Sequence, residues 1–109
     1  MLKKVRRRYL ALKIECDGTL NSREFINAVW NAVLTLYGEY GASKTNLNLI
    51  DYNSEEKLAV IRVAHATVEM IRAALASITR IGNKSVAIHV LTVSGTIKAL
   101  HRKMKHLNH

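Results

Sequence analysis

YLALKIEC, residues 9–16, is the stretch of this sequence that decides the fold, because its side chains alternate in character. One face of an extended chain over this stretch carries Leu10, Leu12, Ile14 and Cys16. The opposite face carries Tyr9, Ala11, Lys13 and Glu15. A period of two indicates a half-buried β-strand. The stretch therefore predicts a strand whose apolar face must be covered by another layer of structure.

Six further elements follow this strand. We predict a helix from Asn21 to about Tyr37, strands at 47–52 and 57–63, a helix at 67–79, a strand at 85–93 and a helix at 97–107. Asn21 and Glu24 have the spacing of a capping box at the start of the first helix. Glycine in the region 38–41 favours the end of that helix.

The order β-α-β-β-α-β-α matches, in its first six elements, the split βαβ or ferredoxin-like arrangement. We therefore predict the α+β fold class, with an RNA-recognition-like βαββαβ antiparallel sheet and two helices on one face. The last element is expected to add a C-terminal amphipathic basic helix. No proline, low-complexity tract or repeat interrupts the sequence, so residues 1–109 are expected to form a single domain.

Composition restricts the compartment in which the chain works. Cys16 is the only cysteine, which excludes an internal disulfide and fits a reducing compartment. No apolar run approaches the roughly 20 residues of a membrane span. No signal-type apolar core follows the basic start. We expect a cytoplasmic protein that does not associate with a membrane.

The net charge of +9 is distributed unevenly along the chain. Residues 1–14 contain six Lys or Arg and residues 70–109 contain seven, and neither segment contains an acid. All eight carboxylates lie in residues 15–69, with only four basic residues. Because the ends of a compact chain often lie close together, we expect the two basic ends to form one patch. Such a patch suits a polyanion, with nucleic acid first and an anionic membrane second, although basic tails also serve solubility alone.

The last helix concentrates positive charge on one side. Lys98, Arg102 and Lys105 have the spacing i, i+4, i+7. The apolar stripe of the same helix consists of Ile97, Leu100, Met104 and Leu107. Since like charges at helical spacing repel and no acid accompanies them, phosphate contact explains this side better than solvation alone. A membrane-surface helix is the alternative.

The first helix is apolar around most of its circumference. Its polar residues between positions 25 and 37 form one narrow stripe, Asn27, Asn31 and Thr35. One sheet face cannot cover the remaining surface. Either the last helix or the N-terminal segment packs over it, or it forms a protein–protein interface, which the Trp and Tyr residues favour. The residues predicted for this interface are Phe25, Trp30, Leu34 and Tyr37.

The sequence contains no recognisable catalytic or metal-binding motif. A lone cysteine cannot build a thiolate metal site, and there is no Gly-rich phosphate loop. A Ser–His pair would meet only in space, so the sequence does not decide on one. We predict no catalytic residue and no metal site.

The residues Ser94-Gly95-Thr96 join the last strand to the last helix. Ser or Thr at this position caps a helix. The same place offers free backbone N–H groups and the positive end of the helix dipole, which together hold phosphates in other proteins. The two roles are compatible, and both are kept as predictions.

A ferredoxin-like sheet also suggests an RNA-recognition motif, which stacks bases on aromatic residues of its central strands. The predicted strand at 57–63 contains no aromatic residue, and only Tyr9 and Tyr52 remain for stacking. We therefore expect contact with RNA through phosphates and shape instead of base stacking.

Five segments occur in the order and spacing of a known family. They are RYLALK (8–13), AVWNA (28–32), GEYGA (38–42), IR (61–62) and VSGTIK (93–98). With them the chain resembles the family of archaeal ribonuclease P protein component 2, which has a eukaryotic counterpart shared with the mitochondrial-RNA-processing ribonuclease. The resemblance runs from about residue 8 to residue 103. The departures are a short N-terminus and an alanine-rich helix after residue 63.

The resemblance implies a protein subunit of ribonuclease P, itself non-catalytic, that binds and stabilises the RNA removing the 5′ leader from precursor tRNA. It implies a TIM-barrel-like ribonuclease P protein subunit as a partner, with a homodimer of this chain inside a heterotetramer. It implies no cofactor bound by the protein, because the RNA uses Mg²⁺ for the hydrolysis.

The acid-free basic ends and the turn before the last helix give the residues predicted to bind RNA, which are Arg6, Arg7, Arg8, Lys13, Ser94, Gly95, Thr96, Lys98, Arg102, Lys103 and Lys105. The alternative function is a stand-alone ferredoxin-like RNA-binding or ribosome-associated protein, which would be a monomer. A third possibility, an acylphosphatase-like hydrolase on the same topology, would need an active-site arginine loop that we do not find in the sequence.

Overall fold

The computed structural model describes residues 6–107, with side chains through residue 105. Its elements are β1 (Arg7–Cys16), α1 (Ser22–Ser43), β2 (Asn48–Asn53), β3 (Leu58–Ala64), a short 3₁₀ turn η1 (His65–Thr67), α2 (Val68–Ser77), β4 (Arg80–Ile81), β5 (Lys84–Ser94) and α3 (Ile97–Leu107). Apart from η1 and β4, these elements match the predicted ones in type and order. The predicted α+β class is confirmed.

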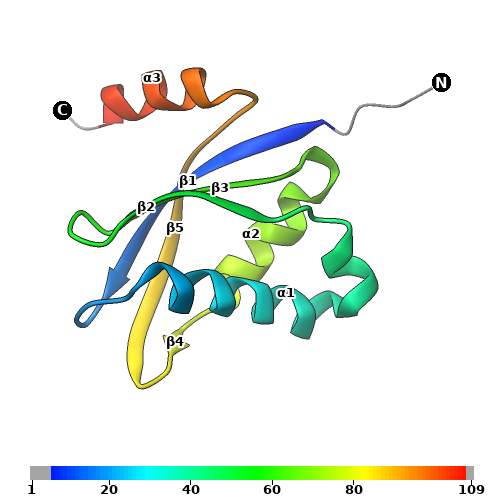
Figure 1. The fold of residues 1–109 in the computed structure, drawn as a ribbon, viewed down its shortest axis with the longest axis vertical. Helices are drawn as coiled ribbons and strands as arrows, with labels where there is room; N and C mark the ends of the chain where they lie inside the picture. Colours follow the sequence, from blue (N-terminus) through cyan, green and yellow to red (C-terminus); the bar gives the residue numbers. More distant parts are fainter. Residues whose placement is uncertain (1–5, 108–109) are drawn as a thin grey trace.

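The five strands form one sheet in the order β2-β3-β1-β5-β4, and all neighbouring strands are antiparallel. Without the short β4, this order is that of the predicted ferredoxin-like topology. The sheet curls strongly, and β1 and β5 cross it as long curved strands (Figure 1). A register shift between Ala11 and Leu12 in the β1–β5 ladder marks a bulge, which increases the local bend.

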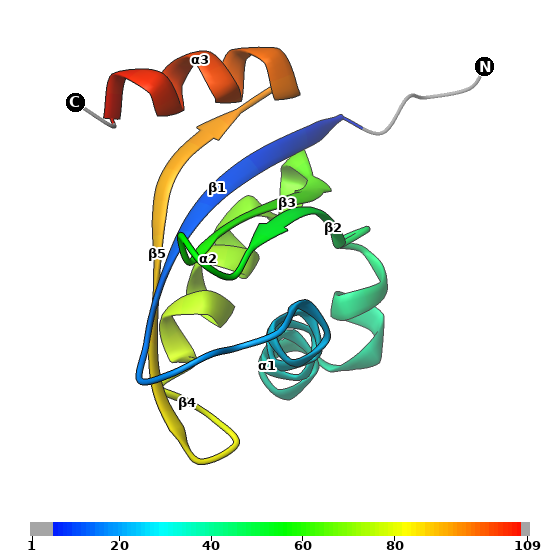
Figure 2. The same cartoon turned by 60° about the vertical axis from the view of Figure 1, so that its left-hand side comes forward.

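The helices α1 and α2 cover one face of the sheet (Figure 2). The alternation of β1 places its apolar face against them, as predicted from residues 9–16. The largest side chains of this core are Leu10, Leu12, Ile14, Phe25, Ile61, Ile71 and Leu75, each at most 1% exposed. The main core of the described residues therefore lies between the sheet and these two helices.

The helix α3 lies on the opposite face of the sheet (Figures 1 and 2). Leu100 is fully buried in a second cluster with Ala11 of β1 and Val60 of β3, and Ile97 and Met104 pack at its edge. Because α3 lies across the sheet from α1, it does not cover the apolar surplus of α1. The prediction that the last helix packs over α1 is therefore wrong.

The start of α1 is as predicted, but its end differs. Asn21 Oδ1 accepts a hydrogen bond from the backbone N–H of Glu24 at 2.8 Å, and Glu24 Oε1 accepts one from the backbone N–H of Asn21 at 3.3 Å. The capping box is therefore confirmed. Gly38, with φ 72° and ψ 179°, interrupts the helix at the predicted stop. Helical geometry then resumes up to Ser43, so glycine produces a kink there and not an end.

The hairpin of β4 and β5 was absent from the prediction. Arg80 pairs with Ser85 and Ile81 pairs with Lys84, around a turn in which Gly82 has φ 63°. Two residues are too few to produce a periodic pattern. The residues after Ser77 belong to this hairpin, which is why α2 ends there and not at the predicted position 79.

Candidate RNA-binding surface

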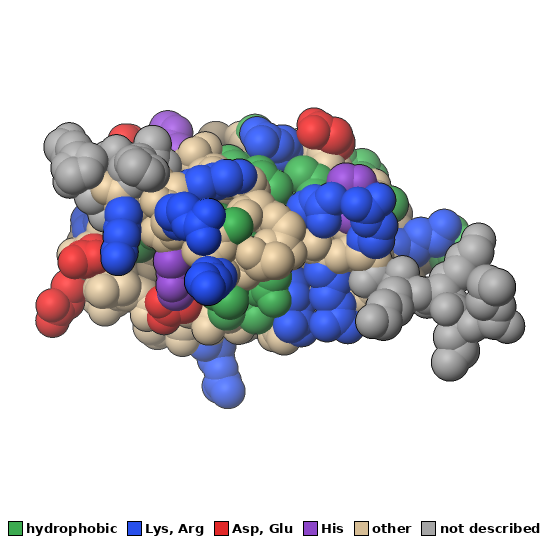
Figure 3. Space-filling model, turned by 90° about the horizontal axis from the view of Figure 1, so that it is seen from above, with side chains coloured by type: hydrophobic (Ala, Val, Ile, Leu, Met, Phe, Trp, Pro, Cys, Tyr) green, Lys and Arg blue, Asp and Glu red, His purple; other side chains and the backbone are tan. Residues whose placement is uncertain are grey.

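Positive side chains gather on the side of the sheet that carries α3. Seen from above, Lys and Arg spread over this side, and Asp and Glu appear mainly toward its edges (Figure 3). We call this region the α3 surface, and define it as Arg6, Arg7, Arg8, Gly95, Thr96, Lys98, His101, Arg102, Lys103 and Lys105.

Three of the predicted phosphate ligands surround one hollow on α3. Lys98, Arg102 and Lys105 line a shallow concavity of about 280 Å³ together with His101. All four side chains are exposed, and none forms an ion pair with another described residue. The three cations span about 10 Å of helix axis. An anion bound in the hollow would relieve the repulsion between them.

The strand β1 brings the N-terminal arginines to the start of α3. Tyr9 and Ser94 are Cα partners in the β1–β5 ladder. The Arg8 guanidinium lies 3.5 Å from the position that a Cβ atom on Gly95 would occupy. For the described residues, the N-terminal basic segment therefore meets the start of α3, and the helix then runs away from the beginning of β1 (Figure 1). Residues 1–5, which include two further lysines, lie outside the described part.

The turn at residues 94–96 caps α3. Thr96 Oγ1 accepts a hydrogen bond from the backbone N–H of Ala99 at 3.1 Å. Ser94, by contrast, is only 5% exposed, because it ends β5 beneath the turn into α3. The prediction that the Ser94 side chain contacts RNA is therefore wrong. Gly95 and Thr96 are exposed, and a phosphate contact there stays a prediction.

Two of the predicted lysines are engaged with the backbone. Lys13 Nζ donates to the carbonyl oxygen of Glu56 at 2.9 Å, and Lys103 Nζ donates to that of Val93 at 2.9 Å. Both keep their charge and so attract a polyanion at longer range. Each would have to give up an internal hydrogen bond to contact a phosphate directly.

Three basic residues of the C-terminal segment lie away from the α3 surface. Arg72 is on α2, Arg80 is on β4 and Lys84 begins β5. Arg72 pairs with Glu69 at 3.9 Å, and Lys84 pairs with Glu24 at 3.8 Å. Counting charge by segment therefore overstated the size of the patch.

Arg62 was not among the residues predicted to bind RNA, because it belongs to the middle segment with its negative net charge. The neighbouring Ile61 and Val63 fill the main core, so the alternation of β3 turns Arg62 to the α3 side. Its Cα partners are Tyr9 on β1 and Asn48 on β2. The same period of two that identified β1 was the signal that could have placed it.

Neither candidate tyrosine provides an open stacking platform. Tyr52 faces the helical layer, where its ring centroid lies 5.5 Å from that of Phe25. Burial raises the pKa of Tyr52 above its usual 10.0, with smaller contributions from the negative charges of Cys16 and Glu24. Tyr9 is on the α3 side but packs against the cluster beneath that helix. The expectation of contact through phosphates agrees with this arrangement.

The predicted protein interface on α1 is exposed only in part. Phe25 is fully buried, because its position on the helix faces the sheet, so the prediction that it contacts a partner is wrong. Trp30 is 37% exposed, and Leu34 and Tyr37 are partly buried. Tyr40, beyond the kink, is 75% exposed. The apolar surplus of α1 is thus real but smaller than predicted.

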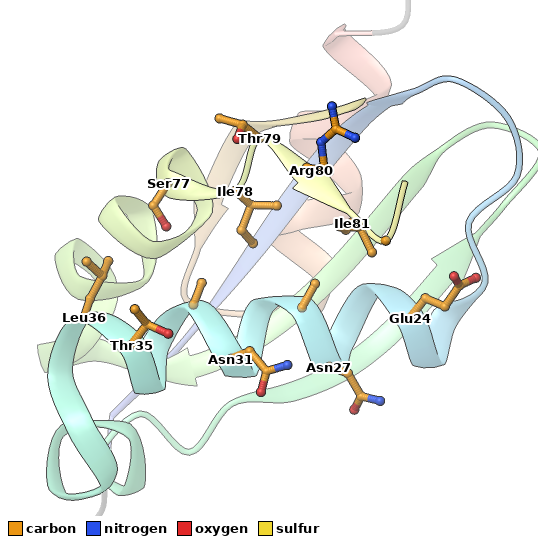
Figure 4. A pocket seen from close by; sticks show the side chains of 13 residues that line it. Glu24, Asn27, Asn31, Thr35, Leu36, Ser77, Ile78, Thr79, Arg80 and Ile81 are labelled. Atoms are coloured by element: carbon orange, nitrogen blue, oxygen red, sulfur yellow. The ribbon is translucent and has the colours of Figure 1, made fainter. Parts of the chain in front are cut away.

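A groove of about 580 Å³ separates α1 from residues 77–82 (Figure 4). The polar stripe Asn27, Asn31 and Thr35 lines its α1 wall. The charged residues of the lining are Glu24 and Arg80, and Glu24 already caps α1. This groove is therefore a polar surface on the helical side, distinct from the α3 surface.

Within residues 6–107, no three His, Cys, Asp or Glu side chains gather to hold a metal ion, and no helix could cross a membrane.

The antiparallel sheet backed by two helices defines a ferredoxin-like domain with the strand order of the RNA-recognition motif. It differs from that motif in the basic helix that covers the usual base-stacking face.

The chain belongs to the Rpp14/Pop5 family, whose sequence model matches residues 8–105. A relative from Methanococcus aeolicus, named ribonuclease P protein component 2, is 33% identical over 95% of this chain and 76% of its own length. One of the same name from Pyrococcus furiosus is 35% identical over 90% of this chain and 82% of its own length. A chain in the cryo-EM structure of yeast ribonuclease MRP has the same fold, with a TM-score of 0.70 at 16% identity over 99% of this chain and 95% of that chain.

Proposed function

We propose that this chain binds the catalytic RNA of ribonuclease P through the α3 surface. Its family and its relatives make it a protein subunit of ribonuclease P, the enzyme that removes the 5′ leader from precursor tRNA. It is thus part of a ribonucleoprotein in which the RNA carries out the catalysis. The observation that carries the RNA-binding proposal is that the exposed cations of α3 line one hollow and that Arg8 adjoins the start of the same helix.

The role of the α3 surface would be electrostatic. Folded RNA brings phosphates close together, and Lys and Arg side chains offset their repulsion while releasing condensed counterions. Contacts of this kind fix position without reading sequence. We assign the Mg²⁺ used in the reaction to the RNA and none to the protein, and we place the complex in the cytoplasm.

The protein partners would bind on the other side of the molecule. We propose a TIM-barrel-like ribonuclease P subunit and a second copy of this chain, together in a heterotetramer. The exposed side chains Trp30, Leu36 and Tyr40 on α1 support a protein contact there, because large aromatic residues anchor interfaces. Since α1 and α3 lie on opposite faces of the sheet, protein and RNA could be bound at the same time.

The RNA contact is tested with the double variant Arg102→Ala/Lys105→Ala. We expect weaker binding to the cognate ribonuclease P RNA, and a plot of log K against log salt that is flatter by about one unit per lost phosphate contact. The matched control is Arg72→Ala/Arg80→Ala, which removes the same charge from the helical side and should leave the slope nearly unchanged. Equal effects of the two variants would mean that only net charge matters, and would remove the α3 surface as the binding site.

The functional consequence is measured by cleavage. Adding this chain and its protein partner to the RNA should lower the Mg²⁺ concentration needed to cleave precursor tRNA. An unchanged Mg²⁺ requirement would count against the proposed function.

The protein contact is tested by sedimentation, in which Trp30→Ala should shift the chain toward monomer. An unchanged mass would exclude Trp30 from the self-association surface.

A further inference from the structure

Arg62 occupies an unusual position in this protein, half-buried on the part of the sheet that α3 leaves uncovered. Its neighbour on the same face of β3, Val60, lies under α3 in the second hydrophobic cluster. Arg62 is one step further toward the end of β3, beside Tyr9 on β1. Arg62 therefore lies on the same face of the sheet as the cluster beneath α3.

The Nε–H group of Arg62 is covered but has no hydrogen-bond acceptor among the described residues. It is the one buried side-chain nitrogen or oxygen of the described part with this property. Buried donors in native proteins are nearly always paired, so one without a partner calls for an explanation. None of the ion pairs between described residues includes Arg62.

The register of the sheet connects Arg62 to the α3 surface. Tyr9 is the Cα partner of Arg62 on one side and of Ser94 on the other. Arg62, Tyr9 and Ser94 therefore form a row across three strands, about 10 Å long at the usual strand spacing. The row ends where Arg8 lies against Gly95, at the start of α3.

We propose that the Arg62 side chain, whose Nε is covered in the free protein, turns outward when RNA binds and holds a phosphate of the RNA backbone through its Nε–H and one Nη–H. The guanidinium is planar and presents these two donors side by side, in the geometry that matches two oxygens of a phosphate. Bound in this way, a phosphate supplies the acceptor that Nε lacks. The contact extends the RNA-binding region from α3 onto the end of β3, and this inference rests on the proposed function.

The test compares Arg62→Lys and Arg62→Gln in the full chain with the cognate RNA. Arg62→Gln should weaken binding about tenfold and flatten the salt plot by about one unit. Arg62→Lys keeps the charge and should preserve the slope, but lose several-fold in affinity because a lysine cannot form the paired contact. Arg23→Gln, an exposed arginine on α1, is the matched control and should bind as wild type.

The Nε–H resonance of Arg62 gives a readout that a merely structural role would not move. In ¹⁵N NMR spectra, it should shift and exchange more slowly when RNA is added, and inorganic phosphate at the same phosphate concentration should have little effect. The inference would be overturned if the resonance did not respond to RNA. It would also be overturned if Arg62→Gln bound RNA as wild type while Arg102→Ala/Lys105→Ala was impaired. Either result would leave the proposed function intact. If Arg62→Gln loses binding to the protein partner but keeps its RNA binding, Arg62 pairs with a carboxylate of that partner, and the inference is also overturned. If wild type itself ignores RNA, both proposals fail.

Discussion

The attachment of α3 to the sheet depends mainly on Leu100. This side chain is fully buried against Ala11 and Val60, and the other apolar residues of the helix in this cluster, Ile97 and Met104, are only partly buried. Leu100→Ala removes three carbon groups at about 0.8 kcal/mol each, or about 2.4 kcal/mol. Since the cluster is separate from the main core, we expect this loss as local opening of α3 and not as global unfolding.

Amide hydrogen exchange measures this opening directly. A loss of about 2.4 kcal/mol corresponds to roughly fiftyfold faster exchange in α3, because about 1.4 kcal/mol is a factor of ten. Amides of β1 at Leu10 and Leu12 should keep their protection. Leu91→Ala makes the same chemical change at a side chain that is 38% exposed, and should have little effect. Faster exchange throughout the sheet in Leu100→Ala would show that α3 is part of the global folding unit and refute the reasoning.

Three further predictions concern stability. Asn21→Ala removes the cap that pairs with Glu24 and should cost about 1 kcal/mol, visible as a lower thermal midpoint, whereas Asn21→Ser should retain most of it. Gly38→Ala should cost about 1–3 kcal/mol in chemical denaturation, because its φ of 72° with ψ of 179° is a conformation nearly restricted to glycine; an unchanged midpoint would mean that the kink relaxes. Folding raises the pKa of Tyr52 above 10.0, so the folded state favours the neutral phenol. The resulting contribution of Tyr52 to the free energy of unfolding is complete below pH 10 and is lost as pH rises through the folded-state pKa. Tyr52→Phe, which also removes the hydroxyl's hydrogen bond to the carbonyl of Leu20, should flatten that loss of stability in alkaline denaturation.

Most of the fold could be predicted from the sequence, because its strong periodic patterns determine which side chains are buried. The alternation at residues 9–16 placed Leu10, Leu12 and Ile14 in the core, and the spacing of Asn21 and Glu24 predicted the first cap. The last helix was predicted with the bounds it has. Each of these signals is local, so a single sequence contains all that is needed to interpret it.

The errors came from properties that depend on which face a residue presents in three dimensions. Phe25 and Trp30 are similar in sequence character, yet the first is fully buried and the second is exposed. Ser94 belongs to a promising turn but lies beneath it, and Arg62 belongs to an acidic segment but reaches the basic side. The side of the sheet on which α3 packs decided all of the site's geometry, and no local pattern specifies it.

The placement of two separate hydrophobic clusters on opposite faces of one sheet has an evolutionary consequence. Substitutions on the outer side of α3 touch neither cluster, so they can alter charge and reach while the folded scaffold keeps its stability. Leu10, Leu12 and Ile14 have no such freedom, because each is closely packed against several elements. A lineage could thus adapt this protein to a diverging RNA by changing one helix, while the packed core stays the same.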